Sequence, residues 1–120
     1  MTVRAIRGAT CLTQDDVAEM TDAVVELMQE ILDKNSLTND DLVSVFFTAT
    51  PDLHSAFPAA SARTIVAPDV PLICAQEIDV AGAMARVIRV MVHVNSDLPR
   101  SDMKHIYLRG AQALRQDIAQ

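Results

Sequence analysis

The sequence predicts an α+β fold, with a mixed β-sheet, one long helix and one short helix. Three observations predict it. One long segment has helical periodicity, several short segments have the two-residue periodicity or apolar richness of strands, and the last three of these strands follow one another without a long helix between them. The predicted order is strand, long helix, strand, short helix, strand, strand, strand.

The first two elements are a strand over residues 3–12 and a helix over residues 14–34. The strand alternates weakly and places Arg7 on the same face as its small apolar residues. In the helix, Thr13 is the expected N-cap and acids follow in the first turn, where they suit the helix dipole. The apolar side chains at helical spacing, which we expect in the core, are Val17, Met20, Val24, Leu27, Met28, Ile31 and Leu32.

In the middle of the chain, the sequence predicts a polar turn and then a strand over residues 42–49 that is rich in Val and Phe. The segment Thr50-Pro51-Asp52 ends it. Pro58 favours the first position of a short helix that extends to about Val66. A short strand over residues 70–74 follows the turn at Pro68-Asp69.

The last third predicts a loop over residues 75–85, a strand over residues 86–94, one helical turn over residues 101–104 and a short strand over residues 105–108. We expect residues 110–120 to form a weakly helical tail. The long helix covers one face of the resulting sheet. No second long helix is available for the other face, which we therefore expect to pack on other subunits.

The strand over residues 86–94 contains an arginine in an apolar setting. Ile88, Val90, Val92 and Val94 form one apolar face, so Arg89 points from the opposite face. A buried unpaired guanidinium would cost several kcal/mol. Arg89 must therefore meet an anionic or electron-rich group, either an internal partner such as Glu77 or Asp79, another copy of the chain, or a ligand.

The length of the chain predicts a single domain, residues 1–120. Its composition is rich in apolar residues. Half of the residues are hydrophobic, mean hydropathy is +0.18 and only 3% are aromatic. We interpret the apolar excess as subunit interface, although a well-filled aliphatic core would have the same composition.

Charge and cysteine content exclude several classes of function. Residues 1–41 hold nine acids and three bases, a balance of −6, whereas residues 42–120 hold seven of each, a balance of zero. Nothing indicates nucleic-acid binding, because there is no basic patch and almost no aromatic residue. Without a signal segment or a long apolar run, we expect no membrane partner and a cytoplasmic protein with reduced thiols at Cys11 and Cys74.

Several predicted strands contain one polar residue among apolar ones, and these polar residues indicate what kind of ligand the protein binds. Arginines spread along the chain could converge on a compact ligand with two anionic groups, such as a small dicarboxylate. The candidates are Arg7, Arg63, Arg89 and Arg115, together with Glu77 and Tyr107. No nucleophile–base arrangement, cofactor fingerprint or metal-ligand spacing is present, so we expect no cofactor and no metal. Such a site suits chemistry that needs positioning and electrostatic stabilisation alone.

Six segments in order resemble the monofunctional chorismate mutases of the Bacillus type, over about residues 3–118. They are Val3-Arg-Ala-Ile-Arg-Gly-Ala-Thr10, Thr48-Ala-Thr-Pro-Asp-Leu-His-Ser-Ala-Phe-Pro-Ala59, Cys74-Ala-Gln-Glu77, Arg86-Val-Ile-Arg-Val-Met-Val92, His105-Ile-Tyr-Leu108 and Leu114-Arg115. The resemblance implies a homotrimer, a pseudo α/β-barrel with active sites at the subunit interfaces. It also implies the cofactor-free rearrangement of chorismate to prephenate in the shikimate pathway, toward phenylalanine and tyrosine.

The resemblance also implies a role for each candidate residue. By similarity, Arg89 donates to the ether oxygen of the breaking bond, Glu77 accepts from the ring hydroxyl, and Arg7 and Tyr107 hold a carboxylate. The remaining implied contacts are Arg63 and Arg115 at the acidic end of the substrate and Phe57 and Cys74 along its ring. Ala60 and Gln116 stand where many relatives have Lys and Pro.

Two other functions are compatible with arginines at subunit clefts. One is an enamine/imine deaminase on a similar trimeric fold, in which an arginine holds a carboxylate. The segments quoted above, with Glu77 shortly after Cys74, weigh against it. The other is a non-catalytic trimer that binds a small acid of the aromatic pathway, because a sensor could keep every arginine.

Overall fold

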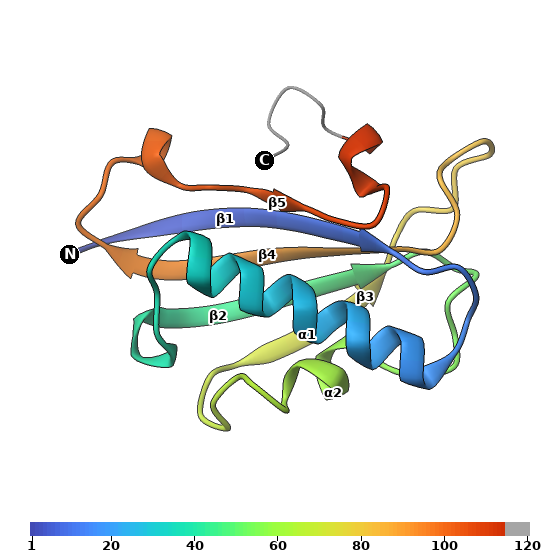
Figure 1. The fold of residues 1–120 in the computed structure, drawn as a ribbon, viewed down its shortest axis with the longest axis horizontal. Helices are drawn as coiled ribbons and strands as arrows, with labels where there is room; N and C mark the ends of the chain where they lie inside the picture. Colours follow the sequence, from blue (N-terminus) through green and yellow to red (C-terminus); the bar gives the residue numbers. More distant parts are fainter. Residues whose placement is uncertain (115–120) are drawn as a thin grey trace.

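The computed structural model describes residues 1–114 and confirms an α+β fold with one mixed sheet (Figure 1). The strands lie in the order β3-β2-β4-β1-β5. The outer pairs β1–β5 and β2–β3 are parallel, whereas β4 is antiparallel to both β1 and β2. The strands are β1 Thr2–Cys11, β2 Leu42–Ala49, β3 Leu72–Gln76, β4 Val87–Ser96 and β5 Ile106–Tyr107.

Two helices cover one face of the sheet, α1 Val17–Lys34 and the short α2 Pro58–Ala62 (Figure 1). The predicted start of α1 was three residues too early. Asp16 is the N-cap, and its side chain accepts from the backbone N–H of Glu19. Thr13 instead donates its hydroxyl to the Glu19 carboxylate, because residues 13–15 form bends before the helix begins.

The core lies between α1 and the face of the sheet that the sequence predicted. Ile88, Val90, Val92 and Val94 of β4 are all buried there. The helix stripe is also confirmed, with the exception of Val17, which is exposed at the first turn. Gly8 allows this close packing, since a Cβ at Gly8 would lie 3.0 Å from Ile31 Cδ1 and 3.1 Å from the carbonyl oxygen of Ile106.

The other boundaries differ modestly from the predicted ones. α2 ends at Ala62 rather than near Val66, and β3 covers Leu72–Gln76 rather than residues 70–74. Single 3₁₀ turns occur at Asn39–Asp41, Arg100–Asp102 and Ala111–Leu114. No helix within residues 1–114 is long and apolar enough to cross a bilayer.

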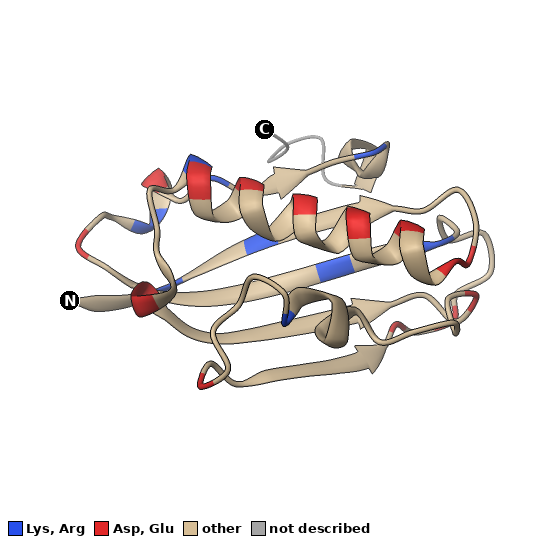
Figure 2. Cartoon of the chain, turned by 60° about the horizontal axis from the view of Figure 1, so that its bottom comes forward, with Lys and Arg blue, Asp and Glu red and all other residues tan. Residues whose placement is uncertain are grey.

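The second face of the sheet has no helix over it in the described part of the chain, apart from the turn Ala111–Leu114. We call it the open face. Val3, Phe46 and Ile73 are 53%, 39% and 59% exposed. Figure 2 shows acidic positions recurring along α1, whereas basic positions interrupt the strands.

Candidate active site

The strand register brings one row of side chains together across the open face. Ala9 pairs with Arg89 on one side and with Tyr107 on the other, and Arg89 pairs with Thr48. Paired residues share a face, so a small side chain, Ala9, separates Tyr107 from Arg89. Ala9 itself is fully buried in a cluster with Tyr107 and Ala111, so space for a ligand lies beside this row and not above Ala9.

A neighbouring row places Arg7 next to Met91, two residues along each strand from Ala9 and Arg89. The two rows border a pocket of about 300 Å³, which we call the Arg89 pocket. Its lining residues are Arg7, Gly8, Phe46, Thr48, Arg89, Val90, Met91 and Tyr107. The structure thus brings together three of the predicted site residues, Arg7, Arg89 and Tyr107.

Glu77 is the internal partner of Arg89. Its Oε2 lies 3.5 Å from Arg89 Nε, and the same oxygen accepts a hydrogen bond from the hydroxyl of Thr48. The backbone N–H of Glu77 donates to the carbonyl of Ala49 at 2.9 Å, which holds the residue just beyond the end of β3. The side chains of Arg89 and Glu77 are 46% and 24% exposed, so solvent screens the pair.

The contact with Glu77 uses only one nitrogen of Arg89. Its two terminal nitrogens have no acceptor within residues 1–114 and remain able to donate to a ligand. The guanidinium of Arg7 and the hydroxyl of Tyr107 likewise have no hydrogen-bond partner in this part of the chain. Tyr107 is nevertheless fixed, because its ring is buried against Ala9 and Ala111.

Phe57 and Cys74 lie elsewhere in the protomer, in a second pocket of about 390 Å³ that we call the Phe57 pocket. Cys74 pairs with the buried Phe47 and packs against the main core, so it faces the helices and not the open face. Phe57 is 70% exposed. Within one chain, the structure therefore does not bring these two residues to Arg89.

Arg63 is not among the residues that line the Arg89 pocket. The guanidinium of Arg63 donates to the carbonyls of Ala67 and Val70 at 2.6 and 2.8 Å, which ties the loop after α2. Arg115 and Gln116 lie outside the described residues. Ala60 is exposed on α2.

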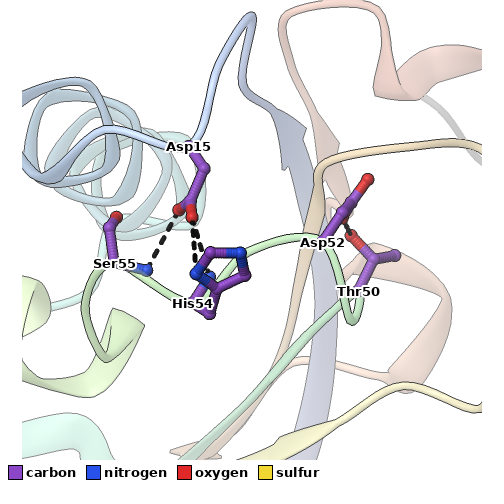
Figure 3. A network of polar contacts seen from close by, with 5 residues as sticks. All are labelled: Asp15, Thr50, Asp52, His54 and Ser55. Carbon is purple, nitrogen blue, oxygen red and sulfur yellow. Dashed lines mark hydrogen bonds and ion pairs between the residues drawn. The ribbon is translucent and has the colours of Figure 1, made fainter.

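Asp15 anchors the loop that leads to Phe57 (Figure 3). Its carboxylate accepts from the backbone N–H groups of His54 and Ser55, both at 3.1 Å, and lies 3.2 Å from His54 Nδ1. The hydrogen bond from the Ser55 side chain, with these other contacts, lowers the pKa of Asp15. Beside it, Thr50 donates to Asp52 at 2.6 Å.

Thr48 and Asp15 were not among the predicted site residues. Thr48 carried a usable signal, because it is a polar residue on the same strand face as Phe46. No local pattern indicated the role of Asp15, since its hydrogen-bond partners, His54 and Ser55, are about 40 residues away in the sequence. Within residues 1–114, no three His, Cys, Asp or Glu side chains are grouped so as to hold a metal ion.

The Arg89 pocket can hold a small anion and stabilise charge. Arg7 and Arg89 offer planar donor forks that match carboxylates. Glu77 offers an acceptor beside Arg89, and Tyr107 offers a hydroxyl. Such fixed donors stabilise negative charge that develops on an oxygen during a reaction.

Comparison with known proteins places this arrangement in a family. The family model for chorismate mutase type I matches residues 3–118. The chain is 38% identical to chorismate mutase AroH of Bacillus subtilis over 120 residues, which cover 99% of this chain and 94% of that protein. It is 43% identical to chorismate mutase AroH of Thermus thermophilus, with 97% and 96% covered.

A solved structure agrees with these sequence matches. Chorismate mutase from Clostridium thermocellum superposes with a TM-score of 0.88 at 44% identity. The match covers 91% of this chain and 97% of that one. The structural likeness therefore extends over most of the chain, and the range matched by the family model includes Arg7, Arg89 and Tyr107.

Proposed function

This chain belongs to the chorismate mutase type I family, and from that premise we propose how its residues act on chorismate. The protein is an isomerase that converts chorismate to prephenate, a step of aromatic amino acid biosynthesis. The observation that carries the proposal is the convergence of Arg7, Arg89 and Tyr107 on one pocket of the open face. Neither the deaminase nor the non-catalytic binding module has support from the relatives.

Arg89 stabilises the transition state. In this intramolecular rearrangement the ether bond breaks as a new carbon–carbon bond forms, and negative charge gathers on the ether oxygen. The terminal nitrogens of Arg89 donate to that oxygen more strongly as its charge grows, which lowers the barrier. The ion pair with Glu77 supports this role, since it fixes one edge of the guanidinium and leaves the other for the substrate.

Glu77, Arg7 and Tyr107 orient the substrate. Glu77 accepts from the ring hydroxyl, while Arg7 and Tyr107, which both line the Arg89 pocket, hold a carboxylate. These contacts fix the folded geometry in which the reacting carbons approach, which converts binding energy into rate. No step passes through a cofactor or a covalent intermediate.

The site is completed between subunits of a homotrimer that forms a pseudo α/β-barrel. Two observations support this proposal. Apolar side chains remain exposed on the open face, and Phe57 and Cys74 form a pocket apart from Arg89 in the same chain. A neighbouring subunit would bring its Phe57 pocket against the Arg89 pocket, with Arg63 and Arg115 near the acidic end of the substrate.

The protein acts as a single 120-residue domain in the cytoplasm.

The direct test is to mix the purified protein with chorismate, follow the loss of its ultraviolet absorbance and identify the product. Rapid formation of prephenate is the expected result. A folded protein that binds chorismate without turnover would instead be a binding module. Release of ammonia from imine substrates would indicate a deaminase.

A further inference from the structure

A third cavity, which adjoins the Arg89 pocket and is separate from the Phe57 pocket, is lined by positively charged residues. It measures about 410 Å³ and lies between the first half of β1 and the segment that follows β4. Arg4, Arg7 and Arg100 line it with His105, over apolar Val3 and Met91. No acid lines it, although the chain as a whole carries a net charge of −6. We call it the arginine cavity.

The guanidinium groups in the arginine cavity have unused donors. Arg4 Nε donates to the carbonyl of Leu98 at 3.0 Å, which leaves its two terminal nitrogens, and the side chains of Arg7 and Arg100 have no acceptor within residues 1–114. The nearest acids in sequence do not line the cavity: Asp97 lies 3.8 Å from the N-terminal amine, and Asp102 is exposed. Water screens these charges, since Arg4 and Arg7 are only partly buried and Arg100 is exposed, but their unused donors would still attract an anion.

The wall of the arginine cavity is held in place by the fold. β5 pairs with β1 only at Gly8 and Ala9, so the earlier part of β1 has a free edge on that side. His105 Nδ1 accepts from the backbone N–H of Arg7 at 2.9 Å, and this bond closes the edge. A neutral His105 therefore carries its proton on Nε2.

We propose that the arginine cavity is a second anion site, which binds a small multivalent oxyanion, a phosphate or a polycarboxylate. Its volume suits a small molecule, and guanidinium forks match both kinds of oxyanion. Enclosure by a neighbouring subunit would increase the need for a counter-ion, because buried charge must be paired. A carboxylate of that subunit is the competing occupant, and it would exclude free anions.

The arginine cavity communicates with the Arg89 pocket, because Arg7 and Met91 line both. An anion that engages Arg7 from the cavity side competes with the substrate carboxylate for the same guanidinium. It therefore raises the KM for chorismate more than it lowers kcat. This consequence rests on the proposed function, whereas binding of the anion does not.

Calorimetric titration with inorganic phosphate at constant ionic strength tests the site. We expect millimolar or tighter binding by the wild type, and at least about tenfold weaker binding by Arg100→Gln, which removes one charge-assisted contact. The matched control is Lys104→Gln, which removes the same charge from an exposed side chain outside the cavity and should bind within about twofold of the wild type.

Arg89→Gln separates the two sites, because it removes an arginine of the catalytic pocket that does not line the arginine cavity. Phosphate binding should persist in this variant. Citrate in place of phosphate identifies the preferred chemistry, since tighter citrate binding means a polycarboxylate and the reverse means a phosphate. The proposal is overturned if the wild type binds neither anion, if Arg100→Gln binds like the wild type, or if Arg89→Gln abolishes binding.

Kinetics provide the second readout. Phosphate should raise the KM of the wild type for chorismate, and Arg100→Gln should reduce that inhibition while its basal turnover stays unchanged. Anion binding without any effect on KM would refute the link through Arg7 and keep the site. A protein without mutase activity that still binds phosphate through Arg100 would refute the proposed function alone.

Discussion

The two faces of β4 have opposite properties although their residues alternate along one strand. Ile88, Val90 and Val92 are buried against α1, whereas Arg89 between them is 46% exposed on the open face. On the helix face, side chains contribute packing, and their loss is measured as stability. On the open face, side chains keep unused donors, and their loss should be measured as rate.

β4 can therefore carry a charged side chain on its open face while its other face packs in an apolar core. The helix-covered face of the sheet holds the core, whereas the open face borders the Arg89 pocket. A change on either face should therefore alter one property and spare the other. Three substitutions test this separation, and a fourth tests the loop anchor at Asp15 outside the sheet.

Arg89→Ala should have the largest effect and should act on rate alone. We expect turnover to fall by at least about 10²–10³-fold, because one donor to a developing oxyanion is lost, or about 2.7–4 kcal/mol. Arg89→Lys should also be poor, since an ammonium does not reproduce the planar fork. The measurement is kcat with chorismate, with circular dichroism and the oligomeric state as controls. A loss below tenfold with the fold intact would remove Arg89 from the mechanism.

Thr48→Val should come next and should also act on rate. The substitution removes the hydroxyl that donates to Glu77 without changing the shape of the side chain. We expect about a tenfold loss in kcat, near the lower limit for a hydrogen bond to a charged group, because Glu77 then holds Arg89 less firmly. Thr48→Ser keeps the donor and should restore kcat. If Thr48→Ser is as slow as Thr48→Val, the hydroxyl does not position Glu77.

Ile88→Val tests the other face of the same strand. Removing one buried methylene should lower the free energy of unfolding by about 0.5–1.5 kcal/mol, measured by urea denaturation. The kcat of the folded protein should stay within about twofold of the wild type. A large loss of kcat with unchanged stability would break the separation between the faces.

Asp15→Asn should have the smallest effect, and the effect should depend on pH. The pKa of Asp15 is lowered in the folded state, so its contribution is present above the unfolded value, about 3.9, and is lost as pH falls through the lower folded value. The variant should melt below the wild type at pH 7, and the difference should shrink below about pH 4.

Asp22→Asn is the matched control for Asp15→Asn. It removes the same charge from an exposed side chain of α1 that has no polar partner within residues 1–114. Its melting temperature should stay close to that of the wild type. A difference between Asp15→Asn and the wild type that persists to the lowest pH would mean that the anchor acts through packing rather than charge.

Much of the fold follows from local patterns in the sequence. The period-two alternation of residues 86–94 predicted correctly which face Arg89 occupies, because burial of one face determines the phase of a strand. The limits of β2 were also correct, since a polar turn and Pro51 bound it. The predicted N-cap of α1 was wrong because Thr13 and Asp16 both satisfy the local rule, and in the structure Asp16 caps the backbone of Glu19 whereas Thr13 contacts its carboxylate.

The site could be predicted less completely. Arg7, Arg89 and Tyr107 each stood out as a polar residue in a strand, and the register then brought them into one pocket. Patterns along the chain did not indicate that Cys74 faces the helices, because β3 is short and its alternation is weak. The anchor at Asp15 depends on contacts between distant segments, which no local pattern encodes.

The backbone at Arg86 determines which insertions this protein can tolerate. Arg86 has φ of 53°, its N–H donates to the Asp52 carboxylate at 3.0 Å, and its Nε donates to the carbonyl of Leu12 at 3.1 Å. This left-handed residue stands immediately before β4 and fixes where the strand begins. An extra residue in the preceding loop would leave the strand unchanged, whereas one between Arg86 and Arg89 would exchange the residues on the buried face of β4 with those on its open face.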